Sequence, residues 1–315
     1  MKKILLSMVC LVMVGMQSVK AQVGIVALHH EGNVTVFGED KLANAIEAAV
    51  AGDTIYMSEG HFLGDVTINK AIHLVGSGQG TIVDGDVNID IENNPSLTGY
   101  MLAALNINGN LRPMKSMDGL RISQCKLKYF QAVKEISLTH FYMERSYLSA
   151  FYTTSLDAGT INNCKFPSLR DYYAIGRSYF YHCNIGGDYT TTGPDAIGVM
   201  AINCIIDDSN GSSYNVYQNC LFRYLGSGKP DNGENCWKAY NSMSTSLFDD
   251  DYNCVLSDQE LQANGYIGTD NTVVGITGGD APYTLKLITP RVLEHNIVVD
   301  KENKKVNVTL TVGTE

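Results

Sequence analysis

Basic residues, proline and tryptophan are all scarce in this sequence. Of its 315 residues, 23 are Lys or Arg and 33 are Asp or Glu, so the formal charge is −10 and the chain lacks the basic surface that general nucleic-acid binding requires. With 7 Pro and 18% charged residues it is neither collagen-like nor a disordered polyampholyte. Against a single Trp there are 18 Tyr, which suit strands, turns and sugar-facing surfaces better than a membrane bundle. These features indicate an acidic globular protein of one large domain or two ordinary ones.

Long apolar runs are also lacking, except for one at the N-terminus that is shorter than the roughly 20 residues a membrane span needs. Lys2 and Lys3 precede this apolar stretch over residues 4–15, and Val19 and Ala21 are small residues at the two positions that a signal peptidase reads. The pattern predicts a signal peptide over residues 1–21 and a secreted, periplasmic or cell-surface protein without a membrane span. Cleavage leaves 20 basic and 33 acidic residues, a formal charge of −13.

The cysteines are regularly spaced. Seven of the eight follow the predicted cleavage site, and an odd number in an exported protein argues against a complete disulfide framework. From Cys125 onward they recur at steps of 39, 19, 21, 16, 16 and 18 residues, and Ser146 fills the gap in the longest step. The eight positions are Cys10, Cys125, Cys164, Cys183, Cys204, Cys220, Cys236 and Cys254.

The sequences around these positions align in six registers, from residues 122–127 to residues 217–222. Each has an apolar residue three positions before the Cys or Ser and another two positions after it. The alternation between the Cys and the position two after it is strand periodicity, so both point to one face. One short strand in each register of about 20 residues predicts a solenoid. Its cysteines are expected to be stacked, buried and free, because neighbouring turns hold the Cβ vectors parallel whereas a disulfide needs a twist of about 90°. The Asn that often precedes the Cys either forms a polar ladder at a corner or faces solvent.

The N-terminal segment carries a resemblance to a known family. An amphipathic helix is predicted over residues 41–50, with Leu42, Ala45, Ile46 and Ala49 on one face. Short strands separated by Gly and Asn turns follow it, at residues 51–57, 60–62, 66–68 and 70–78. A cap helix followed by "GDTI", "G-x-F" and "I-x-L-x-G" resembles the pectin-lyase-like superfamily, and most of all its pectin methylesterases. The resemblance covers residues 40–255 and implies a right-handed parallel β-helix.

Together these patterns predict an all-β fold, a right-handed parallel β-helix (solenoid) with an N-terminal helix cap and a C-terminal β cap. Caps are needed because the open ends of a parallel sheet would pair with other chains. We expect a leader with the cap helix over residues 22–52, in which His29 and His30 belong to a flexible leader, and the β-helix over residues 53–268. Residues 269–315 are predicted to form a C-terminal β cap or a small β-module, with two strands around a charged turn at 301–305.

The catalytic motifs of the superfamily's enzymes are missing. Only an Asp-Asp pair is present, at Asp207 and Asp208, with Asp195 upstream, whereas the Gly-His-Gly and Arg-Ile-Lys segments of polygalacturonases are absent. The pair either begins a solvated turn or supplies two carboxylates for glycoside hydrolysis. The acidic run at residues 249–251 is expected to be a solvated loop and not a calcium site. No cofactor or metal signature is found.

Arg223 and Tyr224 lie as far after Cys220 as Asp207 and Asp208 lie after Cys204. Adjacent turns should therefore bring Asp207 near Arg223, as a surface ion pair or as part of a sugar-binding patch.

The prediction for function is non-catalytic binding of a polysaccharide or a surface partner. The ligand-binding residues expected are Asp207, Asp208, Arg223 and Tyr224. A neutral polysaccharide is favoured, because a charge of −13 repels polyanions unless Ca²⁺ or a local cluster of Arg and Lys intervenes. The alternative is a carbohydrate-active enzyme, namely a polysaccharide lyase, glycoside hydrolase or esterase of an unrecognised subfamily. The oligomeric state stays open.

Overall fold

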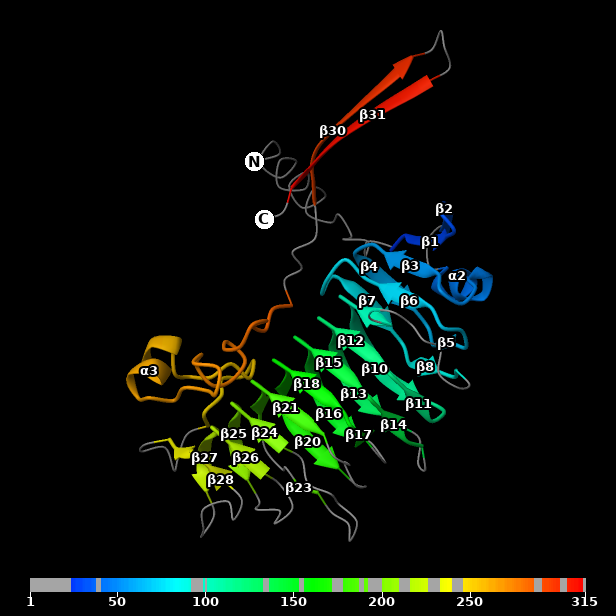
Figure 1. Ribbon diagram of the computed structural model, residues 1–315. Coiled ribbons are helices and arrows are strands. Elements are labelled where there is room, and N and C mark those ends of the chain that lie inside the picture. Colours follow the sequence, from blue (N-terminus) through cyan, green and yellow to red (C-terminus); the bar gives the residue numbers. More distant parts are fainter. Residues whose placement is uncertain are drawn as a thin grey trace, which may run out of the picture.

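The chain folds as a parallel β-solenoid, mostly β with few helices (Figure 1). This computed structural model describes residues 24–37, 41–91, 99, 101–132, 136–152, 156–171, 178–186, 190–191, 200–209, 216–225, 233–239, 246–285, 291–300 and 305–313. The predicted signal peptide, residues 1–21, and Asp195 lie outside these ranges. Within them the helices are α2 (Leu42–Ala48) and α3 (Asp258–Ala263), and neither is long and apolar enough to cross a membrane.

Strands of successive turns pair in parallel and form three sheets. The first sheet contains, in order, β3 (Thr54–Met57), β6 (His73–Val75), β9 (Leu102–Ala103), β12 (Arg121–Ser123), β15 (Tyr142–Glu144), β18 (Thr160–Asn162), β21 (Tyr179–Tyr181), β24 (Met200–Ile202), β26 (Val216–Gln218) and β28 (Gly233–Glu234). The second contains β4 (Gly60–Leu63), β7 (Thr81–Asp84), β10 (Asn106–Pro113), β13 (Lys126–Gln131), β16 (Tyr147–Tyr152), β19 (Lys165–Phe166), β22 (Asn184–Ile185), β25 (Ile205–Ser209), β27 (Leu221–Leu225) and β29 (Trp237–Lys238). Beside it lie β5 (Val66–Ile68), β8 (Val87–Ile89), β20 (Ser168–Asp171) and β23 (Thr190–Thr191), and the short third sheet is β11 (Met117–Asp118), β14 (Leu138–Thr139) and β17 (Leu156–Asp157).

The six registers of the sequence are successive turns of this solenoid, which has about six turns. The position three before the Cys or Ser stacks in register from β12 to β26 and is at most 1% exposed; its residues are Ile122, Met143, Ile161, Phe180, Ala201 and Tyr217. The position two after the Cys or Ser is fully buried in all six turns, in Leu127, Leu148, Phe166, Ile185, Ile206 and Phe222. The prediction that the Cys and the position two after it point to the same face is confirmed, and that face is the core.

The cysteine column is buried between these two columns, and all seven described cysteines are free. Ser146 takes the place of the missing thiol: its Oγ accepts the Cys125 N–H at 3.1 Å and donates to the Glu144 carbonyl at 2.8 Å. Burial raises the pKa of the Cys125 thiol to about 12, so the thiol stays protonated and unreactive at neutral pH. The expectation of stacked, buried thiols is confirmed for Cys125, Cys164, Cys183, Cys204 and Cys220, whereas Cys236 and Cys254 are partly exposed.

The residue before the Cys or Ser forms the corner between the first and second sheets. At this position the backbone is left-handed, with φ between 46° and 57° in Gln124, Arg145, Asn163, His182, Asn203, Asn219 and Asn235. After Gly, Asn is among the residues that adopt this conformation most readily. The recurrent Asn is therefore explained by backbone geometry. Of the two alternatives, a polar column at a corner is observed for the buried Asn163, Asn203 and Asn219, whereas Asn235 is exposed.

Residues 26–37 form a β-hairpin, and the prediction of a flexible leader around His29 and His30 is wrong. Strand β1 (Val26–His30) pairs antiparallel with β2 (Asn33–Phe37) on one side and with β3 on the other. Its two-residue turn, Glu31 and Gly32, has φ of 46° and 80°, as a type I′ turn requires. The two histidines interrupt the apolar alternation of this segment, and for that reason the sequence pattern did not predict a strand here. The predicted helix is present as α2, which contacts β1, β2 and β5, so hairpin and helix together close this end.

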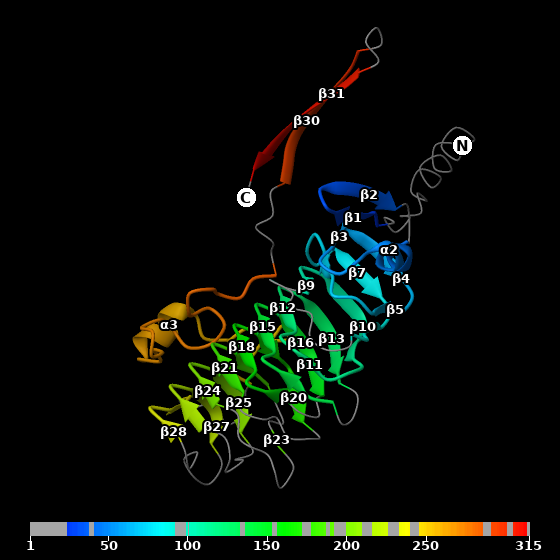
Figure 2. The same cartoon turned by 45° about the vertical axis from the view of Figure 1, so that its right-hand side comes forward.

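Beyond β29 the chain runs back along the outside of the turns as a segment that we call the return segment, residues 246–285 (Figures 1 and 2). Its successive parts contact the corner residues of progressively earlier turns, in the order Asn219, Asn203, Asn163 and Gln124. The boundary predicted at residue 268 falls inside this segment. The two predicted C-terminal strands are present as the antiparallel pair β30 (Arg291–Asp300) and β31 (Lys305–Gly313), which projects away from the solenoid in Figures 1 and 2.

Candidate binding site

The residue directly after the Cys or Ser points outward from the second sheet, because its two neighbours in the strand periodicity point inward. In three successive turns this residue is Lys126, Tyr147 and Lys165, which pair in register on β13, β16 and β19. Parallel strands are about 4.8 Å apart, so the three side chains stand side by side on one face. In later turns the same position becomes apolar, in Ile205, Leu221 and Trp237, and packs against the return segment in a second hydrophobic cluster.

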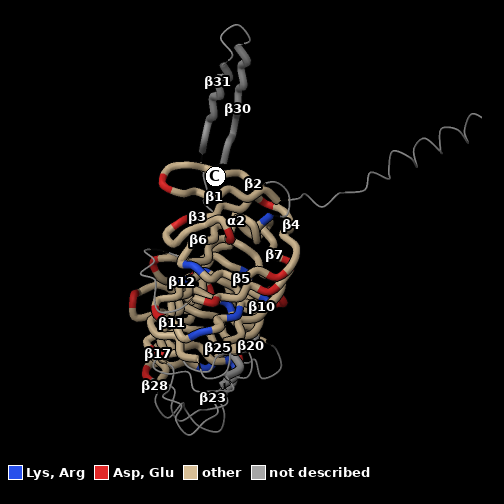
Figure 3. The backbone as a smooth tube through the Cα atoms, turned by 90° about the vertical axis from the view of Figure 1, so that its right-hand side faces the viewer, with Lys and Arg blue, Asp and Glu red and all other residues tan. Residues whose placement is uncertain are grey.

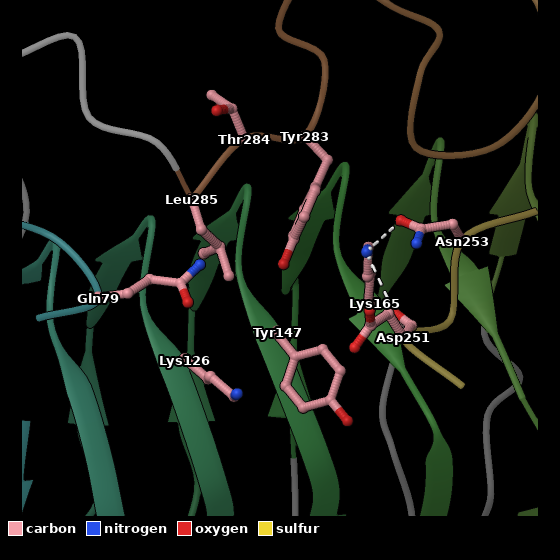
Figure 4. Close-up of a pocket in the computed structure, with 9 residues that line it drawn as sticks. All are labelled: Gln79, Lys126, Tyr147, Lys165, Asp251, Asn253, Tyr283, Thr284 and Leu285. Atoms are coloured by element: carbon pink, nitrogen blue, oxygen red, sulfur yellow. Dashed lines mark hydrogen bonds between the residues drawn. The ribbon is translucent and has the colours of Figure 1, made fainter. Parts of the chain in front are cut away.

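Where the column is polar, it borders a pocket of about 500 Å³ between the second sheet and the return segment. Figure 4 shows the sheet residues on one side and the return segment on the other, with the Tyr283 ring reaching down from the return segment. The pocket is lined by Gln79, Lys126, Tyr147, Lys165, Asp251, Asn253, Tyr283, Thr284 and Leu285. It combines two aromatic rings with several hydrogen-bonding groups, which is the composition of a small-ligand or sugar site.

Lys165 is the most enclosed charge of the pocket. Its Nζ donates to the Asp251 carbonyl at 3.1 Å and to Asn253 Oδ1 at 2.6 Å, and it lies 4.5 Å from the centre of the Tyr283 ring. Burial lowers the pKa of Lys165, although the nearby Asp249 and Asp251 oppose this shift. The ammonium is thus held in place by neutral oxygen atoms and an aromatic face.

Lys126 stands at the open side of the pocket, with its Nζ 5.6 Å from the centre of the Tyr147 ring. The same strands continue the mixture of lysine and tyrosine beyond the pocket. Lys128 Nζ lies 5.4 Å from the centre of the Tyr129 ring, and Tyr129 packs against Tyr152 at 6.4 Å. The outer face of β13 and β16 is therefore a continuous surface of cationic and aromatic side chains.

Corner residues hold the return segment in the position that completes the pocket. Asn163 Nδ2 donates to the carbonyls of Ile276 and Gly278 at 3.1 and 2.8 Å. The buried His182 ring lies 2.7 Å from Asp270 Oδ2 and 3.2 Å from the Gly275 carbonyl, through its two different nitrogens. The Asn203 amide nitrogen also lies 3.1 Å from Nε2, so His182 connects the corner column to the return segment.

The Asp270 carboxylate should make this attachment sensitive to acid. Burial by itself raises its pKa, but hydrogen bonds from Thr272 and the charge of His182 outweigh burial and hold the pKa below its ordinary 3.8. A carboxyl group whose pKa is lowered by folding stabilises the protein above the unfolded pKa and loses that contribution as the pH falls through the folded pKa. Asp270→Asn should therefore lower the melting temperature most near about pH 6 and progressively less below about pH 4. Thermal melts across this range check the prediction, with the exposed Asp250→Asn as control; a difference that is independent of pH contradicts it.

The structure brings two of the predicted site residues together. Arg223 Nε lies 3.0 Å from Asp207 Oδ1, and the same oxygen accepts the Leu247 N–H at 2.7 Å. The predicted ion pair is thus confirmed, and it also anchors the start of the return segment. Asp208 and Tyr224 are opposite each other in the register of β25 and β27, and their side chains lie outside the described part of the structure. A role of the four residues in ligand binding stays a prediction.

The pocket residues were missed in the sequence, although a signal was present. The dipeptides that begin at Cys125, Ser146 and Cys164 place Lys, Tyr and Lys at the outward position of three consecutive registers. Asp249, in the acidic run, accepts backbone N–H groups of Asp251 and Asn253, so this carboxylate orders its own loop. Across the described ranges no group of three or more His, Cys, Asp or Glu residues is arranged to hold a metal ion.

No protein-family model matches the chain, and neither a curated protein nor a solved structure matches it at a significant level. The class that the coordinates define is a mostly β protein built on a parallel β-solenoid.

Proposed function

We propose that this protein is an exported, non-catalytic glycan-binding protein that holds a polysaccharide on the outer face of its second sheet. The observation that carries the proposal is the pocket in which Tyr147 and Tyr283 accompany the amide and ammonium groups of Asn253, Lys126 and Lys165. Aromatic faces stack on sugar rings, and the surrounding polar groups bond hydroxyls. The signal sequence over residues 1–21 and the resemblance to right-handed β-helix proteins of the pectin-lyase-like superfamily support the same function.

Binding without cleavage is favoured by the side chains that line the pocket. Hydrolysis of a glycosidic bond uses two carboxyl groups about 5–9.5 Å apart. Of the nine residues that line the pocket, only Asp251 has a carboxyl group. The Lys165 ammonium donates hydrogen bonds to the Asp251 carbonyl and to Asn253 Oδ1, and these bonds fix its position in the pocket.

The proposal is tested with the mature protein on a panel of immobilised polysaccharides. We expect at least one glycan to bind and Tyr147→Ala to weaken its binding about tenfold, because one stacking face is lost. Tyr56→Ala is the matched control, since Tyr56 is exposed on β3 of the first sheet and does not line the pocket. Release of reducing ends or unsaturated products from the bound glycan would overturn the non-catalytic proposal. Equal loss of binding in Tyr147→Ala and Tyr56→Ala would overturn the assignment of the glycan site to this pocket.

A further inference from the structure

Among the described residues, some basic groups of this acidic protein form ion pairs, whereas the two lysines of the pocket, Lys126 and Lys165, do not, and neither do Lys70, Arg121 and Lys128. The ion pairs within 4 Å occupy Arg112, Lys115, Arg145 and Arg223. Figure 3 shows red acidic positions reaching both ends of the solenoid, with several of the blue basic positions close together over its middle. The pocket itself contains two lysines and one carboxylate, that of Asp251, on a chain whose formal charge is −10.

Within the described part of the chain, the Lys165 ammonium donates its hydrogen bonds to neutral acceptors only. Lys165 is buried, with 5% of its surface exposed, and these two acceptors are the Asp251 carbonyl and Asn253 Oδ1. A desolvated cation is costly unless an anion compensates it. Burial accordingly lowers the pKa of Lys165, and the charges of Asp249 and Asp251 offset that shift only in part. An anion entering the pocket would recover the energy that this lysine loses by burial.

We propose that the pocket recognises an anionic substituent, a carboxylate or a sulfate ester, on the bound glycan; this inference rests on the proposed function. Lys126 and Lys165 are two strands apart, about 9.6 Å along the sheet, with Tyr147 between them. A sugar ring stacked on Tyr147 presents its anionic group to either ammonium. Charge-assisted hydrogen bonds of this kind are stronger than those to hydroxyls. This reverses the preference for neutral glycans that the net charge suggested, because a short-range contact outweighs a screened long-range repulsion.

The test uses matched probes that differ only in charge. These are an oligogalacturonate with its methyl-esterified neutral form, and sulfated with unsulfated dextran, measured by calorimetry on the mature protein. We expect the acidic member of at least one pair to bind about tenfold more tightly than its neutral partner. The pair that shows the preference tells a carboxylate from a sulfate ester.

Charge-neutralising variants locate the effect. Lys126→Gln and Lys165→Gln should each remove most of the preference, whereas Lys41→Gln, the same change at an exposed lysine beside α2 that does not line the pocket, should not. Asp251→Asn should increase affinity for the acidic probe severalfold, because it removes the carboxylate beside the anion; a purely structural role of the lysines does not produce such a gain. Since Lys126 is exposed, its variant keeps the test valid if Lys165→Gln does not fold.

The outcomes separate the two proposals. Equal binding of the acidic and neutral probes, lost in Tyr147→Ala, overturns the anion inference and leaves glycan binding intact. A preference that Lys41→Gln reduces as much as Lys126→Gln also overturns it, since the effect would then be general electrostatics. Absence of binding to every probe and to the whole polysaccharide panel overturns both.

Discussion

Phe151→Ala is expected to lower the free energy of unfolding by about 3–5 kcal/mol, the largest effect of any substitution considered for this protein. Phe151 is fully buried, and its ring centre lies 5.0 Å from that of Phe130 and 6.2 Å from those of Phe141 and Phe166. Removing the ring deletes aromatic contacts on three sides and leaves a cavity, because stacked turns cannot close around it without breaking their strand register.

Chemical denaturation of wild type and variant measures this loss. Leu63→Ala is the control, since Leu63 is 65% exposed and its truncation should change stability by less than about 0.5 kcal/mol. A loss in Phe151→Ala as small as that of the control would show that the phenylalanines do not form a common core. Because solenoids are stabilised mainly between neighbouring repeats, a broadened transition is also expected if the central turns uncouple from the terminal ones.

Asn163→Ala should destabilise the protein by about 3 kcal/mol, through two separate contributions. The left-handed φ of 48° costs about 1 kcal/mol in Ala relative to Asn. The two hydrogen bonds to Ile276 and Gly278 contribute about 1 kcal/mol each, and the carbonyls they satisfy lie against a buried side chain.

Asn163→Gly separates these contributions, because Gly adopts a positive φ freely but makes no side-chain hydrogen bond. It should therefore lose less stability than Asn163→Ala, and denaturation of both variants measures the difference. Since Asn163 holds the part of the return segment that precedes Tyr283, both variants should also weaken glycan binding. If both keep wild-type stability, the corner column does not hold the return segment.

Short-range periodicity accounts for what was predicted correctly. Residues that alternate along a strand must alternate between inside and outside, so Leu127, two positions after Cys125, could be placed on the same face as that cysteine from the pattern alone. Equal offsets from two cysteines likewise placed Asp207 beside Arg223, which the structure confirms at 3.0 Å. The predicted helix at residues 41–50 is present for the same reason, because its apolar spacing is local.

The segments that the sequence patterns predicted wrongly depend on long-range contacts, which no local pattern encodes. The hairpin of β1 and β2 was taken for a leader because His29 and His30 interrupt its alternation, and it is stable through pairing with β3. The return segment has little regular structure of its own. Its path is set by hydrogen bonds such as that between Asn163 and Gly278, which are 115 residues apart.

The sequence by itself determined the stacking of the turns, because a repeat with a strand period fixes which residues face inward and which residues follow one another in a column. It thereby also determined that Lys126, Tyr147 and Lys165 stand side by side. Only the tertiary structure decided that they line a pocket. The outward column is open to solvent until the return segment covers its apolar end at Ile205 and Leu221 and brings Tyr283 over its polar end. Burying that apolar end is the driving force that places the opposite wall of the binding site.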